Sequence, residues 1–155
     1  MEFGRIDREI QVAAAPETVF DVVSRPEHIR LWWSDAAQFE PVPGGVGSIG
    51  FAADDVGAEM IVEGFTVLEV DRPRRFVFRW GHEPGSVAGV ANSFLVVFEL
   101  IPRNDGTLVK MTETGFRERG WTTAVAEGTH RDHVTGWGRF IPRLADYAVR
   151  QATQP

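Results

Sequence analysis

The stretch from His130 to Arg150, HRDHVTGWGRFIPRLADYAVR, decides the fold that this chain is expected to adopt. Its apolar residues recur at steps of three and four, the spacing of one face of an α-helix, while the charged residues fall mostly elsewhere. The stripe consists of Val134, Trp137, Ile141, Leu144 and Ala148, widened by Phe140 and Tyr147. Such a helix needs an apolar cover, and we predict that Trp137, Ile141 and Leu144 are buried against it.

The segments between Phe39 and Gly115 alternate as strands do and supply this cover. The period changes to two from Gln38, and glycine- and proline-rich turns separate the later strands. A bulge is expected near Gly64, because the alternation is blurred there. The predicted strands lie around Ser48–Ala53, Glu59–Val70, 76–80, Asn92–Pro102 and Thr107–Thr114; the turns between them are Asp54–Gly57, Asp71–Arg75 and Asn104–Gly106, with an open loop over Gly81–Ala91.

Shorter elements are expected on both sides of these strands. Arg5–Ala13 alternates as a strand with one wet face, with Ile6, Ile10 and Val12 on the other face. Pro16 begins a helix that runs through Val23, and Pro26 begins a second one that ends near Trp32 and Trp33. Gly115–Gly128 is expected to be a connector with a helical turn after Trp121. In the final helix, Gly136, Gly138 and Pro142 predict a kink, because proline removes a backbone hydrogen bond.

Composition excludes several classes of protein. The chain has 155 residues, which fits one domain over 1–155. It has no cysteine, so a disulfide scaffold and a thiol nucleophile are excluded. The net charge of -6 and the single lysine, Lys110, argue against a nucleic-acid partner. The charged N-terminus and the lack of a run of about 18 apolar residues predict a cytoplasmic protein with no membrane contact.

No motif for phosphate binding, metal-dependent hydrolysis or serine hydrolysis occurs in the sequence, so neither a cofactor nor a metal is expected. His130 and His133 are three residues apart and share a helix face, but a metal site needs at least one further ligand. We therefore interpret both as ordinary surface or capping residues, with His133 also a candidate to orient a ligand. His82 lies in the glycine-rich loop, within reach of a cavity mouth.

Glu113 stands out because its parity with Val109 and Met111 points it inward. A buried carboxylate needs a partner, which can be an arginine, a hydroxyl, a water or a ligand donor. The two interpretations of Glu113 are a functional role in a pocket and a structural ion pair. Replacing it with glutamine is expected to alter ligand choice and leave folding intact. The aromatic residues expected around the space between sheet and helix serve either as core or as a ligand-binding lining; they are Trp33, Phe51, Phe65, Phe78, Trp80, Phe94, Phe98, Trp121, Trp137 and Phe140.

The order of elements resembles the helix-grip fold of the START and birch-pollen-allergen-like superfamily, and more narrowly the family of activator of Hsp90 ATPase homologues. The matching stretches are APETVFDVVSRPEHIRLWW at Ala15–Trp33, PGGVGSIGF at Pro43–Phe51, EGFTVLEVDRPRRFVFRWG at Glu63–Gly81, GTLVKMTETGF at Gly106–Phe116 and HVTGWGRFIPRLADY at His133–Tyr147. The resemblance implies an α+β fold in which a six- or seven-stranded antiparallel sheet wraps round the C-terminal helix, with two short helices after strand one. It also implies an apolar cavity between sheet and helix.

Three functions fit the sequence. The first is a binding domain for a small apolar or aromatic ligand, oriented by Glu113, His82 or His133. The second, implied by the family, is a cochaperone that stimulates an Hsp90-type ATPase. The third is a cyclase- or hydrolase-like enzyme that uses Glu113 or His133 as general acid or base. Either a monomer or a homodimer is compatible with each of these.

Overall fold

Residues 3–52 and 59–153 are described in the computed structural model of this chain, and within them seven strands form one sheet. The predicted turn at Asp54–Gly57 lies outside the described residues. The elements in chain order are β1 (Arg5–Val12), α1 (Pro16–Ser24), α2 (Pro26–Trp32), β2 (Ala36–Phe39), β3 (Val46–Phe51), β4 (Ile61–Asp71), β5 (Arg75–His82), β6 (Phe94–Arg103), β7 (Gly106–Thr114), a 3₁₀ turn (Arg117–Arg119) and α3 (Thr123–Thr153).

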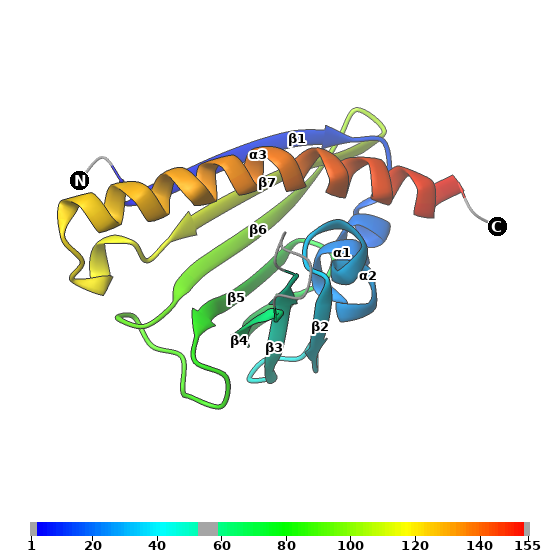
Figure 1. Cartoon of the computed structure of the whole chain (residues 1–155). Coiled ribbons are helices and arrows are strands. Elements are labelled where there is room, and N and C mark those ends of the chain that lie inside the picture. Colours follow the sequence, from blue (N-terminus) through cyan, green and yellow to red (C-terminus); the bar gives the residue numbers. More distant parts are fainter. Residues whose placement is uncertain (1–2, 53–58, 154–155) are drawn as a thin grey trace.

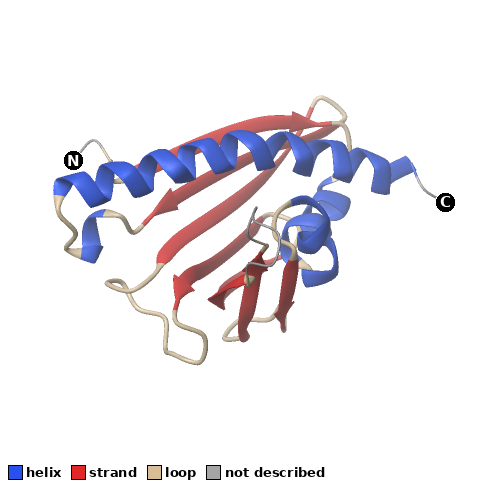
Figure 2. Ribbon diagram, viewed as in Figure 1, coloured by secondary structure: helices blue, strands red, loops and turns tan. Residues whose placement is uncertain are grey.

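The sheet is antiparallel throughout and has the order β1-β7-β6-β5-β4-β3-β2. Strands β2 to β7 follow one another as a meander, and β1 returns to the edge beside β7. Helix α3 lies along one face of the sheet, with α1 and α2 near its C-terminal end (Figures 1 and 2). The predicted α+β helix-grip fold is confirmed, with seven strands.

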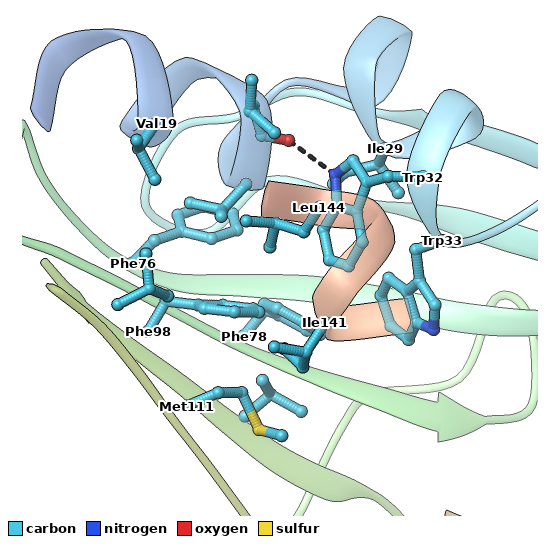
Figure 3. Close-up of a cluster of buried hydrophobic side chains, with 14 of the residues drawn as sticks. Val19, Ile29, Trp32, Trp33, Phe76, Phe78, Phe98, Met111, Ile141 and Leu144 are labelled. Atoms are coloured by element: carbon cyan, nitrogen blue, oxygen red, sulfur yellow. Dashed lines mark hydrogen bonds between the residues drawn. The ribbon is translucent and has the colours of Figure 1, made fainter. Parts of the chain in front are cut away.

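The core lies between α3, the sheet and the two short helices. Trp137, Ile141 and Leu144 are 3%, 4% and 0% exposed, so the predicted helix face is confirmed. Figure 3 shows Ile141 and Leu144 of α3 among Phe78 and Phe98 of the sheet. The same figure shows the hydrogen bond that Trp32 Nε1 donates to the backbone oxygen of Val22 over 2.9 Å, which holds α2 against α1.

Proline residues set the boundaries of the two short helices. Pro16 and Pro26 each occupy the first turn, where a missing N–H costs nothing. Arg25 between them is extended, with ψ 131°, because the residue before a proline avoids the helical region. The chain therefore turns between α1 and α2 as predicted.

A bulge lies beside Gly64, as predicted. Gly64 pairs with His82 and Phe65 pairs with Trp80, so Gly81 is the extra residue, and it belongs to the partner strand β5. Gly81 has φ +86°, a conformation that glycine adopts without strain. Gly64 itself has no room for a side chain, because a Cβ there would overlap the His82 ring.

Two predicted boundaries were wrong. Helix α3 begins at Thr123 and not at His130. The helical turn predicted after Trp121 is present, but it is the start of α3, so the predicted connector over Gly115–Gly128 contains the first residues of the helix. The physical reason is Thr122, which caps the helix: its backbone oxygen accepts from Ala126 N over 2.9 Å and its hydroxyl accepts from Val125 N over 3.3 Å. With this cap the helix tolerates Gly128. Strand β5 also extends to His82, into the predicted loop over Gly81–Ala91.

Helix α3 continues through Pro142 without interruption, with a gentle bow and no sharp break (Figure 1). Pro142 and Gly138 are both exposed, so water reaches the Gly138 carbonyl that has lost its hydrogen-bond donor. The proline that was expected to kink the helix therefore lies where it disturbs packing least. Within the described residues, no helix is long and apolar enough to span a membrane.

Candidate functional site: an aromatic pocket between the sheet and α3

A pocket of about 530 Å³ opens between strands β3 to β5 and the middle of α3. Its volume falls in the range of roughly 300 to 1,000 Å³ that is usual for small-molecule sites. Half of its lining is aromatic and three of its members are ionisable. The lining residues are Trp33, Phe51, Ile61, Glu63, Trp80, Asp132, His133, Gly136, Trp137 and Phe140.

Trp33 is the centre of the aromatic wall. Its ring centroid lies 5.2 Å from that of Trp137 at an interplanar angle of 29°, and 5.2 Å from that of Trp80 at 82°. Phe51 meets it over 5.8 Å at 67°. The four rings therefore stand at several angles to one another, so the wall combines ring faces and ring edges in a packed arrangement.

The Glu113 carboxylate lies directly behind this wall and is fully buried. Oε2 accepts from Trp80 Nε1 over 2.9 Å, and Oε1 accepts from Trp137 Nε1 over 3.0 Å. Oε1 also accepts from His133 Nδ1 over 2.6 Å, since an ionised carboxylate can only accept. Three donors from β5 and α3 thus satisfy one carboxylate on β7, which makes the burial of its charge tolerable.

His133 is fixed by these contacts. Its Nδ1 is committed to Glu113, its ring stacks on Trp80 with centroids 5.4 Å apart, and Phe94 lies 4.5 Å away. The side chain keeps 16% exposure and lines the pocket. A carboxylate on Nδ1 fixes the tautomer of a neutral imidazole, so that Nε2 is the nitrogen with a free lone pair.

Glu63 on β4 is the half-buried carboxyl in the lining. Burial raises the pKa of Glu63 because it disfavours the charged form, and the negative charge of Glu83 acts in the same direction. The positive charge of Arg119 opposes the rise, and so does that of His133 when its ring is protonated. Among the described residues, no ion pair within 4 Å reaches Glu63, so its carboxyl remains available to a ligand.

Arg119 lies at the same end of the sheet but outside the lining. Its guanidinium lies over the ring of Phe94 at 4.3 Å and over that of Trp121 at 4.9 Å. Burial lowers the pKa of Arg119. Within the part of the chain that the structure describes, its Nε and Nη2 atoms have no hydrogen-bond partner. The aromatic faces are therefore its main contacts.

The sequence matches the model of one known protein family. Residues 13–148 match the family model described as activator of Hsp90 ATPase homolog 1-like protein. The chain belongs to this family. A search of the curated proteins found no match.

Solved structures show that other proteins share the fold of this chain. A protein from Nitrosomonas europaea has a TM-score of 0.75 at 16% identity, covering 97% of each chain. The Aha1 dimer from Colwellia psychrerythraea has a TM-score of 0.63 at 19% identity, covering 92% of this chain and 93% of its own. CalU16 from Micromonospora echinospora has a TM-score of 0.61 at 19% identity, covering 93% and 75%. At these identities the likeness concerns the fold.

The pocket of this family member brings together only part of the set predicted from the sequence. The predicted residues that line it are Trp33, Phe51, Trp80, His133, Trp137 and Phe140. Phe65, Phe78 and Phe98 pack in the core beneath the pocket, and each is at most 1% exposed. Phe94 and Trp121 lie beside Arg119, and Glu113 lies behind the wall.

The other histidines take positions away from the pocket lining. His82 is the last residue of β5 and is buried; its Nε2 lies 3.2 Å from Thr66 Oγ1 and its Nδ1 lies 3.3 Å from Ser86 Oγ. His130 Nε2 lies 3.0 Å from the backbone oxygen of Arg5. His130 and His133, although three residues apart, therefore have separate partners.

Four lining residues were not predicted: Ile61, Glu63, Asp132 and Gly136. Glu63 and Ile61 share their parity with Phe65 and Val67, which are buried on the concave face, so alternation along β4 carried the signal. Gly136 lies three residues after His133 and one before Trp137 on the helix. Its lack of a side chain leaves the space into which the pocket opens.

Proposed function

We propose that this protein binds a small, largely apolar or aromatic molecule in the pocket between the sheet and α3. The volume of about 530 Å³ and the five aromatic lining residues support this function. Ligand sites of this kind combine an apolar wall with a few well-placed polar groups, and here Glu63, Asp132 and His133 supply them.

The observation that carries the proposal is the buried Glu113 carboxylate. A wall that served only as core filling would need no charge behind it, because an apolar residue of similar size is often neutral or more stable there. Instead, Trp80, His133 and Trp137 are each held by a hydrogen bond to one carboxylate. Such fixed side chains lower the entropic cost of ligand binding.

Two glycine variants of α3 test the proposal. Gly136 lines the pocket, and a Cβ there would meet only the Phe140 ring, at 3.8 Å, so Gly136→Leu fills the pocket without a backbone clash. Gly138→Leu is the matched control, because a Cβ there meets nothing within 4 Å and the residue is exposed. Both changes should favour the helix, by about 1 kcal/mol each.

The probe is N-phenyl-1-naphthylamine, a neutral aromatic dye whose fluorescence rises in apolar surroundings. We expect the wild type and Gly138→Leu to bind it with a Kd in the micromolar range, about 8 kcal/mol at 1 μM. Gly136→Leu should weaken binding at least about tenfold, since the side chain occupies the site. Equal binding by the two variants would place the dye elsewhere and remove the support for this function.

The Glu113–His133 pair favours a second candidate, an enzyme in which His133 Nε2 takes a proton from a bound substrate. The carboxylate on Nδ1 and the free Nε2 in the lining are the arrangement of an oriented general base. Hydrolysis of 4-nitrophenyl acetate is a suitable first assay. His133→Gln should reduce it, while the control His28→Gln, changed beside Tyr147, should not. A rate that is the same in all three proteins contradicts this candidate.

Stimulation of an Hsp90-type ATPase is a third candidate, and the family description supports it. No contact of the described residues favours it over ligand binding. Measurement of ATP hydrolysis by a purified Hsp90-type protein, with and without a saturating amount of this chain, separates the two. A cytoplasmic location and a monomeric or dimeric state stay predictions.

A further inference from the structure

The polar groups that face the pocket are mainly hydrogen-bond acceptors. The indole N–H groups of Trp80 and Trp137 both point to Glu113, so neither is left for a ligand. The carboxyls of Glu63 and Asp132 belong to the lining, and so does His133, whose Nε2 accepts when the ring is neutral. The indole N–H of Trp33 is a donor in the lining that no hydrogen bond among the described residues uses. The carboxyls and the imidazole are acceptors, so a ligand that satisfies them must bring donors itself.

The charge of the lining points in the same direction. Two carboxyls line the pocket, and among the described residues no lysine or arginine belongs to the lining. Glu113 adds a third carboxylate behind the wall, with His133 as its partner. Arg119, outside the lining, offsets part of the negative charge at Glu63. The described lining residues still include two carboxyls with no lysine or arginine among them, and such groups attract a cation.

The aromatic rings supply a second attraction for positive charge. Trp33, Trp80 and Phe51 meet at angles of 52° to 82° with centroids 5.2 to 6.0 Å apart, so their surfaces meet at a corner. Faces of aromatic rings attract ammonium groups, and tryptophan does so most strongly. Rings in several orientations suit a compact, rounded group such as a substituted ammonium.

From these observations, and resting on the proposed function, we propose that the natural ligand is an organic cation. It carries an amine or substituted ammonium group beside Glu63, Asp132 and the tryptophans, and an apolar or aromatic body fills the remaining space.

The arginines near the pocket are arranged so that they do not occupy this position. Arg119 is held over Phe94 and Trp121. Arg139 and Arg143 each lie 5.6 Å from the centroid of Phe140 and are exposed on α3. Phe140 therefore already has cations beside it, and the wall of Trp33, Trp80 and Phe51 is the part left for the ligand.

Three phenols that differ only in the para substituent test the charge of the ligand. They are (4-hydroxyphenyl)trimethylammonium, 4-tert-butylphenol and 4-hydroxybenzenesulfonate, which are cationic, neutral and anionic; the first two have nearly the same shape. Their affinities are measured by isothermal titration calorimetry on the wild-type protein. We expect the cation to bind about tenfold more tightly than the neutral phenol, and the sulfonate to bind most weakly.

Carboxyl variants locate the source of this preference. Glu63→Gln and Asp132→Asn should each reduce the ratio between cation and neutral phenol, and the double variant should bring it close to one. Asp146→Asn, an exposed change on the same helix, is the control and should leave the ratio unchanged. Circular dichroism checks that each variant is folded.

The outcomes separate this inference from the proposed function. Equal or tighter binding of the neutral phenol or the sulfonate overturns the cation proposal and leaves small-molecule binding standing. A preference for the cation that survives the double variant also overturns it, because the named carboxyls would not be its cause. Failure of all three phenols to bind contradicts both the cation proposal and the pocket function.

Discussion

Trp137 Nε1 on α3 donates a hydrogen bond of 3.0 Å to Oε1 of Glu113 on β7, and this bond joins the long helix to the sheet at the back of the pocket. Both residues are buried, at 3% and 0% exposure. In such surroundings a satisfied hydrogen bond to a charge stabilises the fold, whereas a broken one leaves a buried group without a partner. The bond therefore couples the position of α3 to the shape of the pocket wall.

Glu113→Gln should destabilise the protein by about 1 to 3 kcal/mol. The carboxylate accepts three hydrogen bonds, from Trp80, Trp137 and His133, but a glutamine has one acceptor oxygen and places its NH₂ against a donor. The loss in the free energy of unfolding is measured by urea denaturation followed by tryptophan fluorescence.

Glu9→Gln is the control for this change, because Glu9 is an exposed residue of β1. We expect its effect to stay within about 0.5 kcal/mol. If the two variants were equally stable, the three hydrogen bonds to Glu113 would contribute nothing to the fold.

The sequence predicts the direction of Glu113 but not its partners. Strand parity with Val109 and Met111 was sufficient to place the side chain inside, and the burial of Glu113 confirms that prediction. Parity says nothing about which residues of other elements meet the carboxylate. We expected Glu113→Gln to leave folding intact because the partners of the carboxylate were not known from the sequence. The three donors that meet Glu113 in the structure predict a loss of stability instead.

Leu144→Ala should cost about 2 to 5 kcal/mol, because Leu144 is fully buried between α3 and the sheet and its removal leaves a cavity. Leu31→Ala on α2 is the matched control, since Leu31 is 58% exposed. Its cost should stay below about 0.5 kcal/mol. Thermal and urea unfolding measure both, and a small loss for Leu144 would contradict its place in the core.

Pro142→Ala should stabilise the protein by about 1 to 3 kcal/mol. The alanine restores the N–H that can bond to the Gly138 carbonyl and removes a proline that costs about 3 kcal/mol inside a helix. Part of this gain, about 0.4 to 1 kcal/mol, is lost because alanine is freer than proline in the unfolded chain. Pro142 is exposed, so no packing is lost. A lower melting temperature would show that the proline has a role in the bow of α3.

The free energy of unfolding of Glu63→Gln, minus that of the wild type, should increase as the pH rises. Burial raises the folded-state pKa of Glu63 above the ordinary glutamate value of about 4.3. The contribution of Glu63 to stability is then fully present below that ordinary value and is lost as pH rises through the folded pKa, because ionisation is harder in the folded state. Glutamine has no such loss.

Urea unfolding of both proteins from pH 4 upward measures this difference, in which the effects of groups that do not interact with Glu63 cancel. Arg119, His133 and Glu83 are the charges that act on Glu63, and they are the same in both proteins. A difference that falls as pH rises would mean that Glu63 gains a positive partner in the folded state.

Alternation and helical spacing carried the prediction of most strands and of the buried face of α3, because these features depend on neighbours in the chain. Features that depend on contacts between distant elements were missed. The burial of His82 is one example, because it depends on the space above Gly64. Membership of the pocket likewise depends on which concave-face residues stay uncovered, and Glu63 was missed for that reason. The start of α3 was missed for a local reason, because the helix tolerates Gly128 once Thr122 caps it.

The indole N–H signals of the tryptophans provide the most direct test of the pocket. Trp80 and Trp137 bond to Glu113 behind the pocket wall, whereas Trp32 bonds to the backbone oxygen of Val22 in the core and serves as an internal control. ¹H–¹⁵N NMR spectra are recorded during titration with 4-tert-butylphenol. Saturable shifts of the Trp80 and Trp137 signals, with that of Trp32 unchanged, are the predicted result; unchanged Trp80 and Trp137 signals at saturating phenol would contradict the account.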